Sequence, residues 1–289
     1  MAPLIERYPR VVRGTNKSGF IARKKKQEKR SEYAISQTTA KTAVITGAAG
    51  GIGKELARRM AERRVNLVLV DLNEDALKAV VQELNLDDTH SLIVAADVTK
   101  EEDVQNYVNK AVEKFGTIDY FANNAGIEGP MGNIDEQSVK ALDLVYNVNV
   151  RGVFLGLHYV IPVMKKQQSG AILNTSSLAG LMGAPGMAPY IMSKHAVIGL
   201  TRVAANEVAS YGIRVNAVLP GTINTRMMRQ IEANSGAADQ YQEANKAATP
   251  LGRYGEPQEV AAVMNFLLSD EASFVTASLY TVDGGMVGQ

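Results

Sequence analysis

The feature that most constrains the fold is a regular alternation of short apolar segments with helical segments, which begins at residue 42. The apolar segments have the length of buried parallel strands and cover residues 42–46, 66–71, 91–96, 118–122, 170–176, 213–218 and 278–282. The helical segments cover residues 52–64, 74–85, 101–115, 136–166, 190–210 and 257–268. Such alternation predicts an α/β architecture with right-handed crossovers. We therefore expect one doubly wound, seven-stranded parallel sheet with helices on both faces.

The first strand runs directly into a glycine-rich turn and a helix. Residues 42–53 read Thr-Ala-Val-Ile-Thr-Gly-Ala-Ala-Gly-Gly-Ile-Gly, which places Gly47, Gly51 and Gly53 in this turn. Glycines let a backbone approach a pyrophosphate, and a helix amino terminus offers free N–H groups and partial positive charge. Because the spacing differs from the G-x-G-x-x-G form, the turn alone is compatible with a dinucleotide site or with a tight turn without ligand.

The second strand ends in an acid, Asp71, which follows Gly47 by 24 residues. In dinucleotide-binding folds an acid near this distance accepts hydrogen bonds from the adenosine ribose. It would repel the 2′-phosphate of NADP, and neither Leu72 nor residues 48–50 supply a basic side chain. The sequence therefore predicts NAD as the cofactor. Asp71 could also cap the next helix.

Two further strand ends carry small or polar residues. Asp97 and Val98 could place a carboxylate and a backbone N–H at the adenine edge, although Asp97 could equally cap the helix that starts near Lys100. Asn123-Asn-Ala-Gly126 follows the fourth strand, where small residues allow close approach to a cofactor and asparagines can also simply close a turn.

Tyr190 and Lys194 lie four residues apart in a helical segment and therefore share one helix face. A neighbouring ammonium favours the phenolate and lowers the pKa of a phenol, which is ordinarily about 10. Lowering that pKa to about 7 takes roughly 4 kcal/mol. One lysine near water supplies less, so a second positive charge is needed, and an oxidised nicotinamide ring would provide it. Without a cofactor site, the pair would be an ordinary contact on a helix surface.

Taken together, these motifs resemble the short-chain dehydrogenase/reductase family. The matching residues appear in the order and spacing of the family over residues 41–285 and are Thr46, Gly47, Gly51, Gly53, Asp97, Asn123, Asn124, Ala125, Gly126, Asn149, Ser177, Tyr190, Lys194, Pro220 and Gly221. The resemblance implies a single-domain Rossmann fold and an NAD(P)-dependent enzyme that acts on CH–OH groups.

The resemblance also implies a catalytic set of Asn149, Ser177, Tyr190 and Lys194. Ser177 would hydrogen-bond the substrate oxygen, and Tyr190 would exchange a proton with it. Lys194 would lower the pKa of Tyr190 and hold the nicotinamide ribose, and Asn149 would anchor a water that links Lys194 to solvent. The serine of the family stands thirteen residues before the tyrosine, which selects Ser177 over Ser176.

The cofactor site implied by the resemblance comprises Gly47, Gly51, Ile52, Gly53, Asp71, Leu72, Asp97, Val98, Asn124, Ala125, Gly126, Tyr190, Lys194, Pro220, Gly221, Ile223 and Thr225. Ile223 and Thr225 match positions that contact the carboxamide and so select the ring face that takes the hydride. Alternatively, Pro220-Gly221 could form an ordinary turn that binds no ligand.

The candidate substrate wall is mostly apolar. It comprises residues 128–131, 178–182 and 186–187, together with a lid insertion over 222–255 that carries Met227, Met228 and Ile231. This composition favours a neutral apolar alcohol or ketone. Residues 124–128 and 151–157 resemble NAD-dependent cyclic-alcohol dehydrogenases and levodione-reductase-like members of the family.

Two other functions stay open at this point. Arg226 and Arg229 could bind a carboxylate or an acyl-carrier phosphate, which would suit a 3-oxoacyl-carrier-protein reductase. That enzyme would normally use NADP and a basic residue near the glycine turn, which this chain lacks. The fold could also serve as a dinucleotide-sensing protein without turnover, although the complete set of Ser177, Tyr190 and Lys194 argues against it.

Charge separates the amino terminus from the remainder of the chain. Residues 1–30 have a net charge of +8 and residues 31–289 a net charge of −7. We expect residues 1–40 to be a flexible basic extension and residues 41–289 to form the dehydrogenase domain. A solvated tail is favoured over a transit-like peptide or a nucleic-acid-binding patch at Lys24–Lys26.

The cysteine and histidine content and the hydropathy of the chain limit the partners and cofactors that we expect for it. The chain has no cysteine, which excludes disulfides and thiolate metal sites and fits a reducing compartment. Its three histidines share no metal-ligand spacing, and no apolar run approaches the length of a membrane span. We expect a cytoplasmic enzyme without metal, nucleic-acid or membrane partners. Helices 136–166 and 190–210 resemble the subunit-contact helices of the family, so we also expect a homotetramer.

Overall fold

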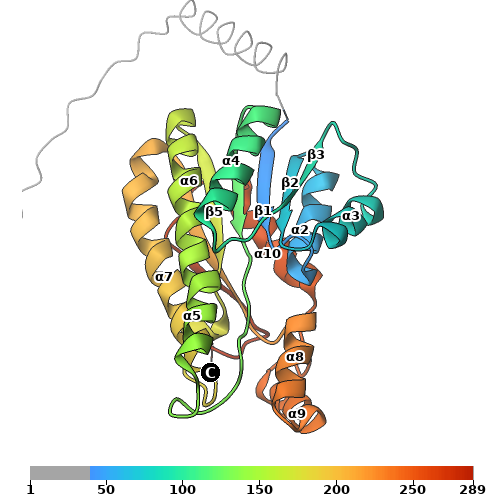
Figure 1. Cartoon of the computed structure of the whole chain (residues 1–289), viewed down its shortest axis with the longest axis vertical. Helices are drawn as coiled ribbons and strands as arrows, with labels where there is room; N and C mark the ends of the chain where they lie inside the picture. The colour runs from blue at the N-terminus through green and yellow to red at the C-terminus, as the bar shows by residue number, and fades with distance from the viewer. Residues whose placement is uncertain (1–39, 289) are drawn as a thin grey trace, which may run out of the picture. The chain divides into compact units, whose positions relative to one another are not determined.

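The computed structural model describes residues 40–288, in which seven strands form one parallel sheet with the order β3-β2-β1-β4-β5-β6-β7 (Figure 1). Their bounds are β1 Thr42–Thr46, β2 Asn66–Asp71, β3 Ser91–Ala95, β4 Tyr120–Asn123, β5 Gly170–Thr175, β6 Ile213–Pro220 and β7 Leu279–Val282. The strand order reverses between β1 and β4, and ligands of such sheets bind where the carboxyl ends of the strands diverge. The predicted doubly wound fold is confirmed. The expected basic extension lies outside the described residues, except for residue 40.

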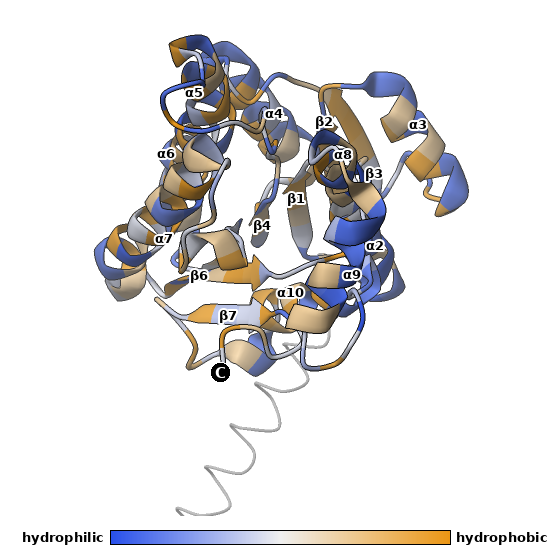
Figure 2. Ribbon diagram, turned by 90° about the horizontal axis from the view of Figure 1, so that it is seen from below, coloured by the Kyte–Doolittle hydropathy of each residue, from blue (hydrophilic) through white to orange (hydrophobic). Residues whose placement is uncertain are grey.

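Two sets of helices cover the two faces of the sheet (Figures 1 and 2). One face packs against α2 Gly51–Glu62, α3 Glu74–Glu83 and α10 Pro257–Leu268, and the other against α4 Glu101–Phe115, α6 Gly152–Gln167 and α7 Ala188–Val208. Successive side chains of β1 explain this division, because they point to opposite faces. Ala43 and Ile45 belong to the first core and Val44 to the second.

The fourth strand starts later than predicted. The sequence indicates a strand over 118–122, whereas β4 spans Tyr120–Asn123. Ile118 is excluded from the sheet because its N–H and its carbonyl both bond the side-chain amide of Gln167, at 3.0 and 2.9 Å. Its apolar side chain is nevertheless fully buried, which is why the pattern extended the strand to it.

The helix predicted over 136–166 is continuous from Val139 to Gln167 but contains a π-helical turn. Its parts are α5 Val139–Tyr146, the π turn Asn147–Arg151 and α6. It starts at Val139 because the hydroxyl of Ser138 accepts a hydrogen bond from the N–H of Ala141, at 3.1 Å, as an N-cap. π turns of this kind occur often at functional sites, and this one contains Asn149.

By length and composition, this helix is apolar enough to cross a membrane. It has 29 residues and a mean hydropathy of 1.2 in its most apolar window, half of which is buried against the rest of the fold. Val153, Leu157 and Val160 lie in the core, so we assign it as a core helix. Polar residues divide the apolar stretches of this helix, so no single apolar run within it reaches the length of a membrane span.

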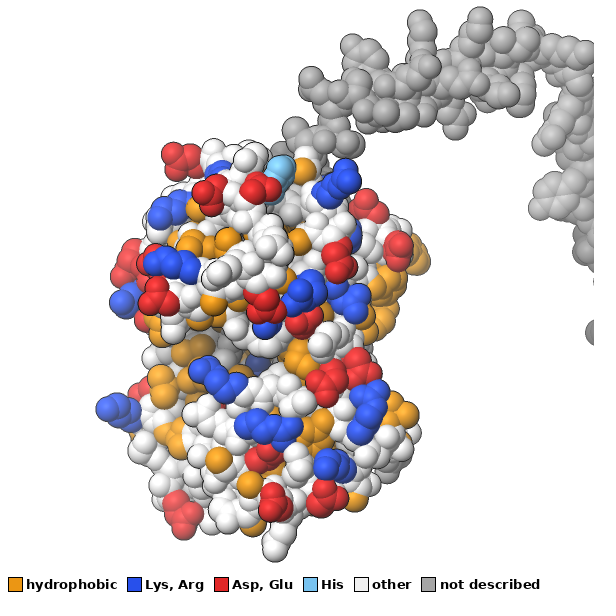
Figure 3. All heavy atoms as spheres, turned by 90° about the vertical axis from the view of Figure 1, so that its right-hand side faces the viewer, with side chains coloured by type: hydrophobic (Ala, Val, Ile, Leu, Met, Phe, Trp, Pro, Cys, Tyr) orange, Lys and Arg blue, Asp and Glu red, His pale blue; other side chains and the backbone are white. Residues whose placement is uncertain are grey.

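The predicted lid insertion over 222–255 contains two helices that the sequence pattern did not indicate. These are α8 Arg226–Asn234 and α9 Ala238–Ala248, separated by a turn in which Gly236 has a φ of +73°. The hydroxyl of Thr225 caps α8 by accepting from the N–H of Met228, at 3.2 Å. Figure 3 shows a hollow between these two helices and the region of α2 and α3, with apolar side chains at its edge.

Candidate active site

The glycine turn packs too closely for any other residue at two of its positions. Gly47 has a φ of +66°, and a Cβ there would lie 3.0 Å from the Cα of Ala125. A Cβ on Gly53 would lie 2.2 Å from the carbonyl oxygen of Gly47. No side chain caps the amino terminus of α2, so its first N–H groups are available to an anion. The turn has the form and the polarity of a pyrophosphate cradle.

Asp71 directs its carboxylate toward this turn. One oxygen accepts from the N–H of Ala49 at 3.1 Å and the other from the N–H of Asn73 at 3.3 Å. The cap of α3 is Asn73, whose side chain accepts from the N–H of Ala76 at 3.0 Å. The alternative role of Asp71 as a helix cap is therefore wrong. Leu72 projects into solvent and is 74% exposed.

Asp97 follows β3 at the edge where β2 ends at Asp71. The N–H of Ala96, the residue before Asp97, donates to the carbonyl of Asp71 at 3.0 Å. The carboxylate of Asp97 accepts from the N–H and the hydroxyl of Thr99, at 3.0 and 2.7 Å. Helix α4 has Lys100 as its N-cap residue, without a side-chain bond, so the expectation that Asp97 caps it is wrong. The N–H of Asp97 donates to the carboxylate of Asp103, at 2.9 Å.

The neighbour of Asp97, Val98, packs against the start of α6. A Cβ on Gly152 would lie 3.0 Å from a methyl group of Val98. This contact fixes the loop after β3, in which Asp97 and Val98 stand, against the helix that follows the π turn.

Asn124 joins three strand ends at the point where the strand order reverses. Its side-chain NH₂ donates to the carbonyl of Thr46 at 3.1 Å, and its side-chain oxygen accepts from the hydroxyl of Thr175 at 3.1 Å. The hydroxyl of Thr46 in turn accepts from the N–H groups of Asn124 and Ala125. Asn124 thereby holds the segment that leads to Gly126. The hydroxyl of Thr175 is a contributor that the sequence analysis missed.

Tyr190, Lys194 and Asn149 converge around Gly126. Tyr190 stands in the first turn of α7, and the Nζ of Lys194 lies 5.4 Å from the centre of its ring. That Nζ also donates to the carbonyl of Thr175, at 3.1 Å. A Cβ on Gly126 would lie 3.4 Å from the Nζ of Lys194 and 3.3 Å from the Oδ1 of Asn149. The structure thus brings these three predicted residues together, although they come from two separate helical segments.

Ser177 and Ser176 point in different directions. The hydroxyl of Ser176 is buried and donates to the carbonyl of Lys194, at 2.8 Å. The hydroxyl of Ser177 accepts from the N–H of Ala179 at 3.2 Å and donates to the carbonyl of Pro220 at 3.5 Å. It also lies close enough to the phenol of Tyr190 to lower the pKa of that group. Of the two serines, only Ser177 therefore has its hydroxyl beside the phenol.

Asn149 uses its whole amide as a bridge. Its oxygen accepts from the N–H of Ile127 at 2.9 Å, and its NH₂ donates to the carbonyl of Ile127 at 2.8 Å and to the hydroxyl of Ser193 at 3.0 Å. Ser193 donates onward to the carbonyl of Tyr190, at 2.6 Å. The π turn presents Asn149 so that it ties the loop after β4 to α7. Ser193 was missed in the sequence, where it stands directly before Lys194.

The loop after β6 closes over the glycine turn. A Cβ on Gly51 would lie 3.6 Å from the methyl group of Thr225. Ile223 is buried and pairs with Gly255, and Gly221 packs against the backbone of Asp283. The structure therefore brings the predicted residues after Pro220 next to those after β1.

Burial dominates the two ionisable groups of the proposed centre. It raises the pKa of Tyr190, an effect that the hydrogen bond from Ser177 opposes and the negative charge of Glu128 reinforces. Burial lowers the pKa of Lys194 to about 8. Burial therefore raises the pKa of Tyr190, whereas the sequence predicted that Lys194 would lower it. The second positive charge inferred from the sequence must overcome this burial as well.

Burial of the charged Lys194 side chain lowers the free energy of unfolding, and this effect can be measured. In the unfolded chain Lys194 holds its proton up to its ordinary pKa of 10.5, whereas in the folded chain it releases it near 8. The unfolded state thus binds more protons between these values, so stability rises with pH over this window and the full penalty applies below it. The difference between the two pKa values corresponds to a loss of about 3 kcal/mol in the free energy of unfolding. The hydrogen bond from Lys194 to Thr175 offsets about 1 kcal/mol of this loss.

We therefore expect Lys194→Met to raise the free energy of unfolding at pH 7 by about 2 kcal/mol, and this gain to disappear toward pH 10. Urea unfolding at both pH values measures it, with the exposed Lys78→Met as control. A variant that is less stable than the parent at pH 7, or a gain that does not change with pH, would contradict the assignment of a buried ammonium.

Two arginines of the lid, Arg226 and Arg229, differ in the partners that they have. The guanidinium of Arg229 bonds the carboxylate of Glu232 at 2.8 Å and lies 5.5 Å from the ring centre of Tyr254. Arg226 is exposed and has no hydrogen-bond or ion-pair partner within residues 40–288. Of these two, Arg226 is therefore the one that is free to meet an anionic group.

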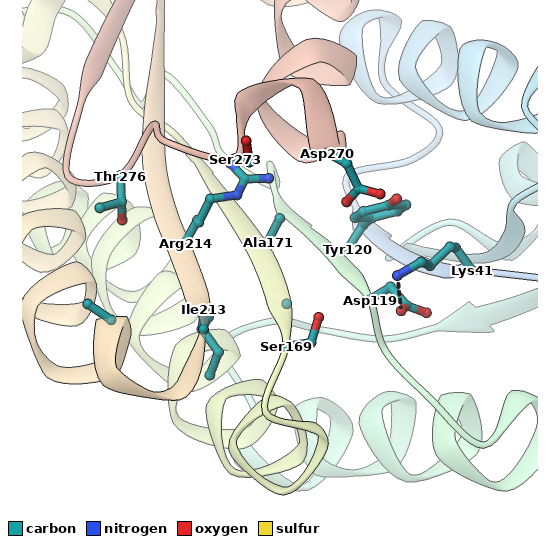
Figure 4. A pocket seen from close by; sticks show the side chains of 13 residues that line it. Lys41, Asp119, Tyr120, Ser169, Ala171, Ile213, Arg214, Asp270, Ser273 and Thr276 are labelled. Atoms are coloured by element: carbon teal, nitrogen blue, oxygen red, sulfur yellow. Dashed lines mark ion pairs between the residues drawn. The ribbon is translucent and has the colours of Figure 1, made fainter. Parts of the chain in front are cut away.

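A separate cavity of about 340 Å³ lies at the opposite, amino-terminal edge of the sheet (Figure 4). Three of its charged side chains, those of Lys41, Asp119 and Arg214, already have partners. Lys41 pairs with Asp119 at 3.1 Å, and the guanidinium of Arg214 donates to the carbonyls of Leu267 and Ser269. Because it lies away from Tyr190 and the glycine turn, we assign it no part in the site.

A parallel doubly wound sheet with a glycine turn, an acid on β2 and a serine–tyrosine–lysine cluster defines a dinucleotide-binding oxidoreductase. Comparison with known proteins agrees with this class. A family model described as enoyl-(acyl carrier protein) reductase matches residues 47–287. The chain belongs to the short-chain dehydrogenase/reductase family and is an oxidoreductase.

The relatives include levodione reductase of Leifsonia aquatica, 42% identical over 86% of this chain and 94% of the relative. Cyclohexanol dehydrogenase of Acinetobacter sp. (strain SE19) is 41% identical over 84% and 94% of the two chains. A 3-oxoacyl-[acyl-carrier-protein] reductase of Thermotoga maritima is 39% identical over 86% and 98%.

Solved structures match the fold closely. A structure of levodione reductase aligns with a TM-score of 0.82 and 39% identity, covering 87% of this chain and 99% of that chain. ElxO with NADP bound gives 0.80 and 34%, covering 86% and 100%. NAD⁺-bound xylitol dehydrogenase gives 0.79 and 36%, also covering 86% and 100%. The family therefore binds a nicotinamide dinucleotide, and both forms occur among its members.

Proposed function

We propose that this enzyme interconverts a secondary alcohol and a ketone with NAD as the cofactor. The observation that carries the proposal is the meeting of Tyr190, Lys194 and Ser177 at the carboxyl edge of the sheet, next to the turn that ends at Gly53. The names of two relatives, levodione reductase and cyclohexanol dehydrogenase, support a neutral cyclic substrate. The apolar wall around residues 128–131 and 178–187 suits such a molecule.

The residues present fit a dinucleotide. The glycine turn and the uncapped start of α2 would hold the pyrophosphate, and the carboxylate of Asp71 would accept from the ribose hydroxyls. Gly126 leaves room beside Lys194 that any larger residue would fill. When bound, the dinucleotide would accept or supply the hydride.

The side chains of the chain would handle the proton. In ketone reduction, the hydroxyl of Ser177 would hydrogen-bond the substrate oxygen and the phenol of Tyr190 would donate a proton to it. In alcohol oxidation, the phenolate of Tyr190 would take that proton. The ammonium of Lys194, 5.4 Å from the ring centre, favours the phenolate.

Asp71 supports NAD over NADP. Its carboxylate would face the 2′-position of the adenosine ribose, where the additional phosphate of NADP carries negative charge. Leu72, the next residue, is exposed and brings no compensating cation. The relatives with bound cofactor include one of each kind, so this preference rests on Asp71.

The second candidate is a 3-oxoacyl-carrier-protein reductase. The relative from Thermotoga maritima and the exposed, unpaired Arg226 favour it. Asp71 argues against it if such an enzyme uses NADP. Because Arg229 is occupied by Glu232, the anionic contact would depend on Arg226 alone.

A substrate panel tests these two functions. We expect NADH-dependent reduction of cyclic ketones such as cyclohexanone and NAD-dependent oxidation of the corresponding alcohols. Activity confined to NADPH and 3-oxoacyl thioesters would overturn the proposal in favour of the second candidate. Arg226→Ala serves as the matched control, since it should slow reduction of a thioester on a carrier protein and leave cyclohexanone reduction unchanged.

We also propose a cytoplasmic homotetramer. Leu144, Phe154, Met192 and Val203 are about half exposed on α5, α6 and α7, and such apolar surface on neighbouring helices suits subunit contact. Light scattering should give four times the mass of one chain, and cell fractionation should recover the enzyme with the cytoplasm. A monomeric mass or recovery in another compartment would contradict the respective part.

A further inference from the structure

We propose that Gln137 is a positioning residue whose side-chain amide clamps together the two loops that border the substrate site. The inference rests on the proposed function, because it assigns these loops to the substrate wall. The first loop comprises residues 124–133 and the second residues 178–187. By holding them together, Gln137 would set which ketones fit beside Tyr190.

Both loops start or end at the proposed centre. The 178–187 loop connects Ser177 at its start to the helix that carries Tyr190. The 124–133 loop passes Gly126, which faces Lys194, and carries Glu128, whose charge acts on Tyr190. A movement of either loop would therefore change the space in which the substrate lies.

Gln137 stands just before α5 and bonds both loops at once. Its NH₂ donates to the carbonyl of Gly132 at 2.7 Å and to the carbonyl of Gly186 at 3.0 Å. The N–H of Gly132 also donates to the carbonyl of Gly186, at 3.0 Å. Within residues 40–288, every hydrogen bond that links the two loops passes through these three residues.

The chemistry of this contact requires an amide. Both neighbours of the side chain are acceptors, so the group between them must offer two donors, and the NH₂ of glutamine does so. The Oε1 of Gln137 is buried and has no hydrogen-bond partner within residues 40–288. A buried acceptor without a partner costs free energy. The fold thus tolerates this cost where the NH₂ joins the two loops.

The two loops differ in how much else holds them. The 124–133 loop is fixed at Ile127 by Asn149, and at Gly129, where a Cβ would lie 2.4 Å from Val145. In the 178–187 loop, residues 181–185 are all exposed. Its far end is held to the first loop only at Gly186, so the second loop depends on the clamp.

Two variants of nearly the same size test the clamp. Gln137→Met removes both donors, and Gln137→Glu replaces them with a carboxylate that faces two carbonyls. Gln105→Met and Gln105→Glu, at an exposed position on α4, are the matched controls. Because a displacement near 1 Å can cost about 100-fold in rate, we expect kcat/KM for cyclohexanone to fall between about 10-fold and 100-fold. Binding of NADH, followed by fluorescence titration, should stay unchanged.

The pH profile separates a donor role from a merely structural one. Protonation at low pH gives the carboxyl of Gln137→Glu one donor, so its activity relative to the parent should recover as pH falls. The relative activity of Gln137→Met should stay flat. An unchanged kcat/KM for cyclohexanone in both variants, or a Gln137→Glu profile parallel to that of Gln137→Met, would overturn the proposal.

Hydrogen exchange distinguishes failure of the clamp from failure of the proposed function. The N–H of Gly132, which donates to the carbonyl of Gly186, should exchange faster in full-length Gln137→Met than in the parent, whatever the substrate is. Unchanged exchange there would refute the clamp. If exchange is faster in Gln137→Met but the parent enzyme itself reduces no ketone, the clamp would be supported and the proposed function rejected.

Discussion

Tyr190→Phe should lower kcat for ketone reduction by about 10³-fold, the size of effect that a positioned general acid supplies. The variant removes a single oxygen and keeps the ring that packs near the Nζ of Lys194. We therefore expect the fold and the binding of NADH to be preserved. Stopped turnover with intact fluorescence titration of NADH would show that only the proton transfer is lost.

The matched control for this variant is Tyr146→Phe. Tyr146 lies on α5 and is 47% exposed, so its hydroxyl has no part in the proposed centre. It should keep the activity of the parent. If Tyr190→Phe retained turnover within a few-fold of the parent, the assignment of Tyr190 as the acid and base would fail.

Asp71→Ala should shift the cofactor preference from NAD toward NADP. The carboxylate would accept from the ribose hydroxyls, and hydrogen bonds to a charged group contribute about 1.5–3 kcal/mol each. Its removal also ends the repulsion of the 2′-phosphate. Together these changes should lower the ratio of kcat/KM for NAD to that for NADP by at least about 100-fold.

Steady-state kinetics with both cofactors measures this ratio. Asp75→Ala is the control, because Asp75 lies on the nearby α3 with its side chain 93% exposed. Melting curves are needed as well, since Asp71 also accepts from the N–H of Ala49. A ratio that stayed the same in a folded Asp71→Ala protein would refute the ribose assignment and the preference for NAD.

The sheet could be predicted because each strand carries its own local signal. The strands are buried on both faces, so they read as apolar runs, and glycines or acids end them at the carboxyl edge. The amino-acid sequence therefore predicts that Gly47, Asp71 and Gly126 lie together at this edge. Tyr190 and Lys194 were also predictable, because helical geometry fixes their relation within one segment.

The rest depended on contacts between distant segments. The π turn at Asn149 has no sequence signal, since it is stabilised by bonds to Ile127 and Ser193. The cap of α3 could not be assigned between Asp71 and Asn73 by residue type, because both are good caps. The raised pKa of Tyr190 results from its burial in the assembled fold. The spacing of Tyr190 and Lys194 in the sequence does not predict that burial.

The central claim is that this enzyme moves a hydride between a secondary alcohol and NAD. The most direct test incubates the full chain with NAD and cyclohexanol that carries deuterium at the carbinol carbon, and measures the mass of the reduced dinucleotide. We predict that the dinucleotide gains one deuterium and that cyclohexanone accumulates in equal amount. Reduced dinucleotide without deuterium, or no reduction with any secondary alcohol of the panel, would contradict the account.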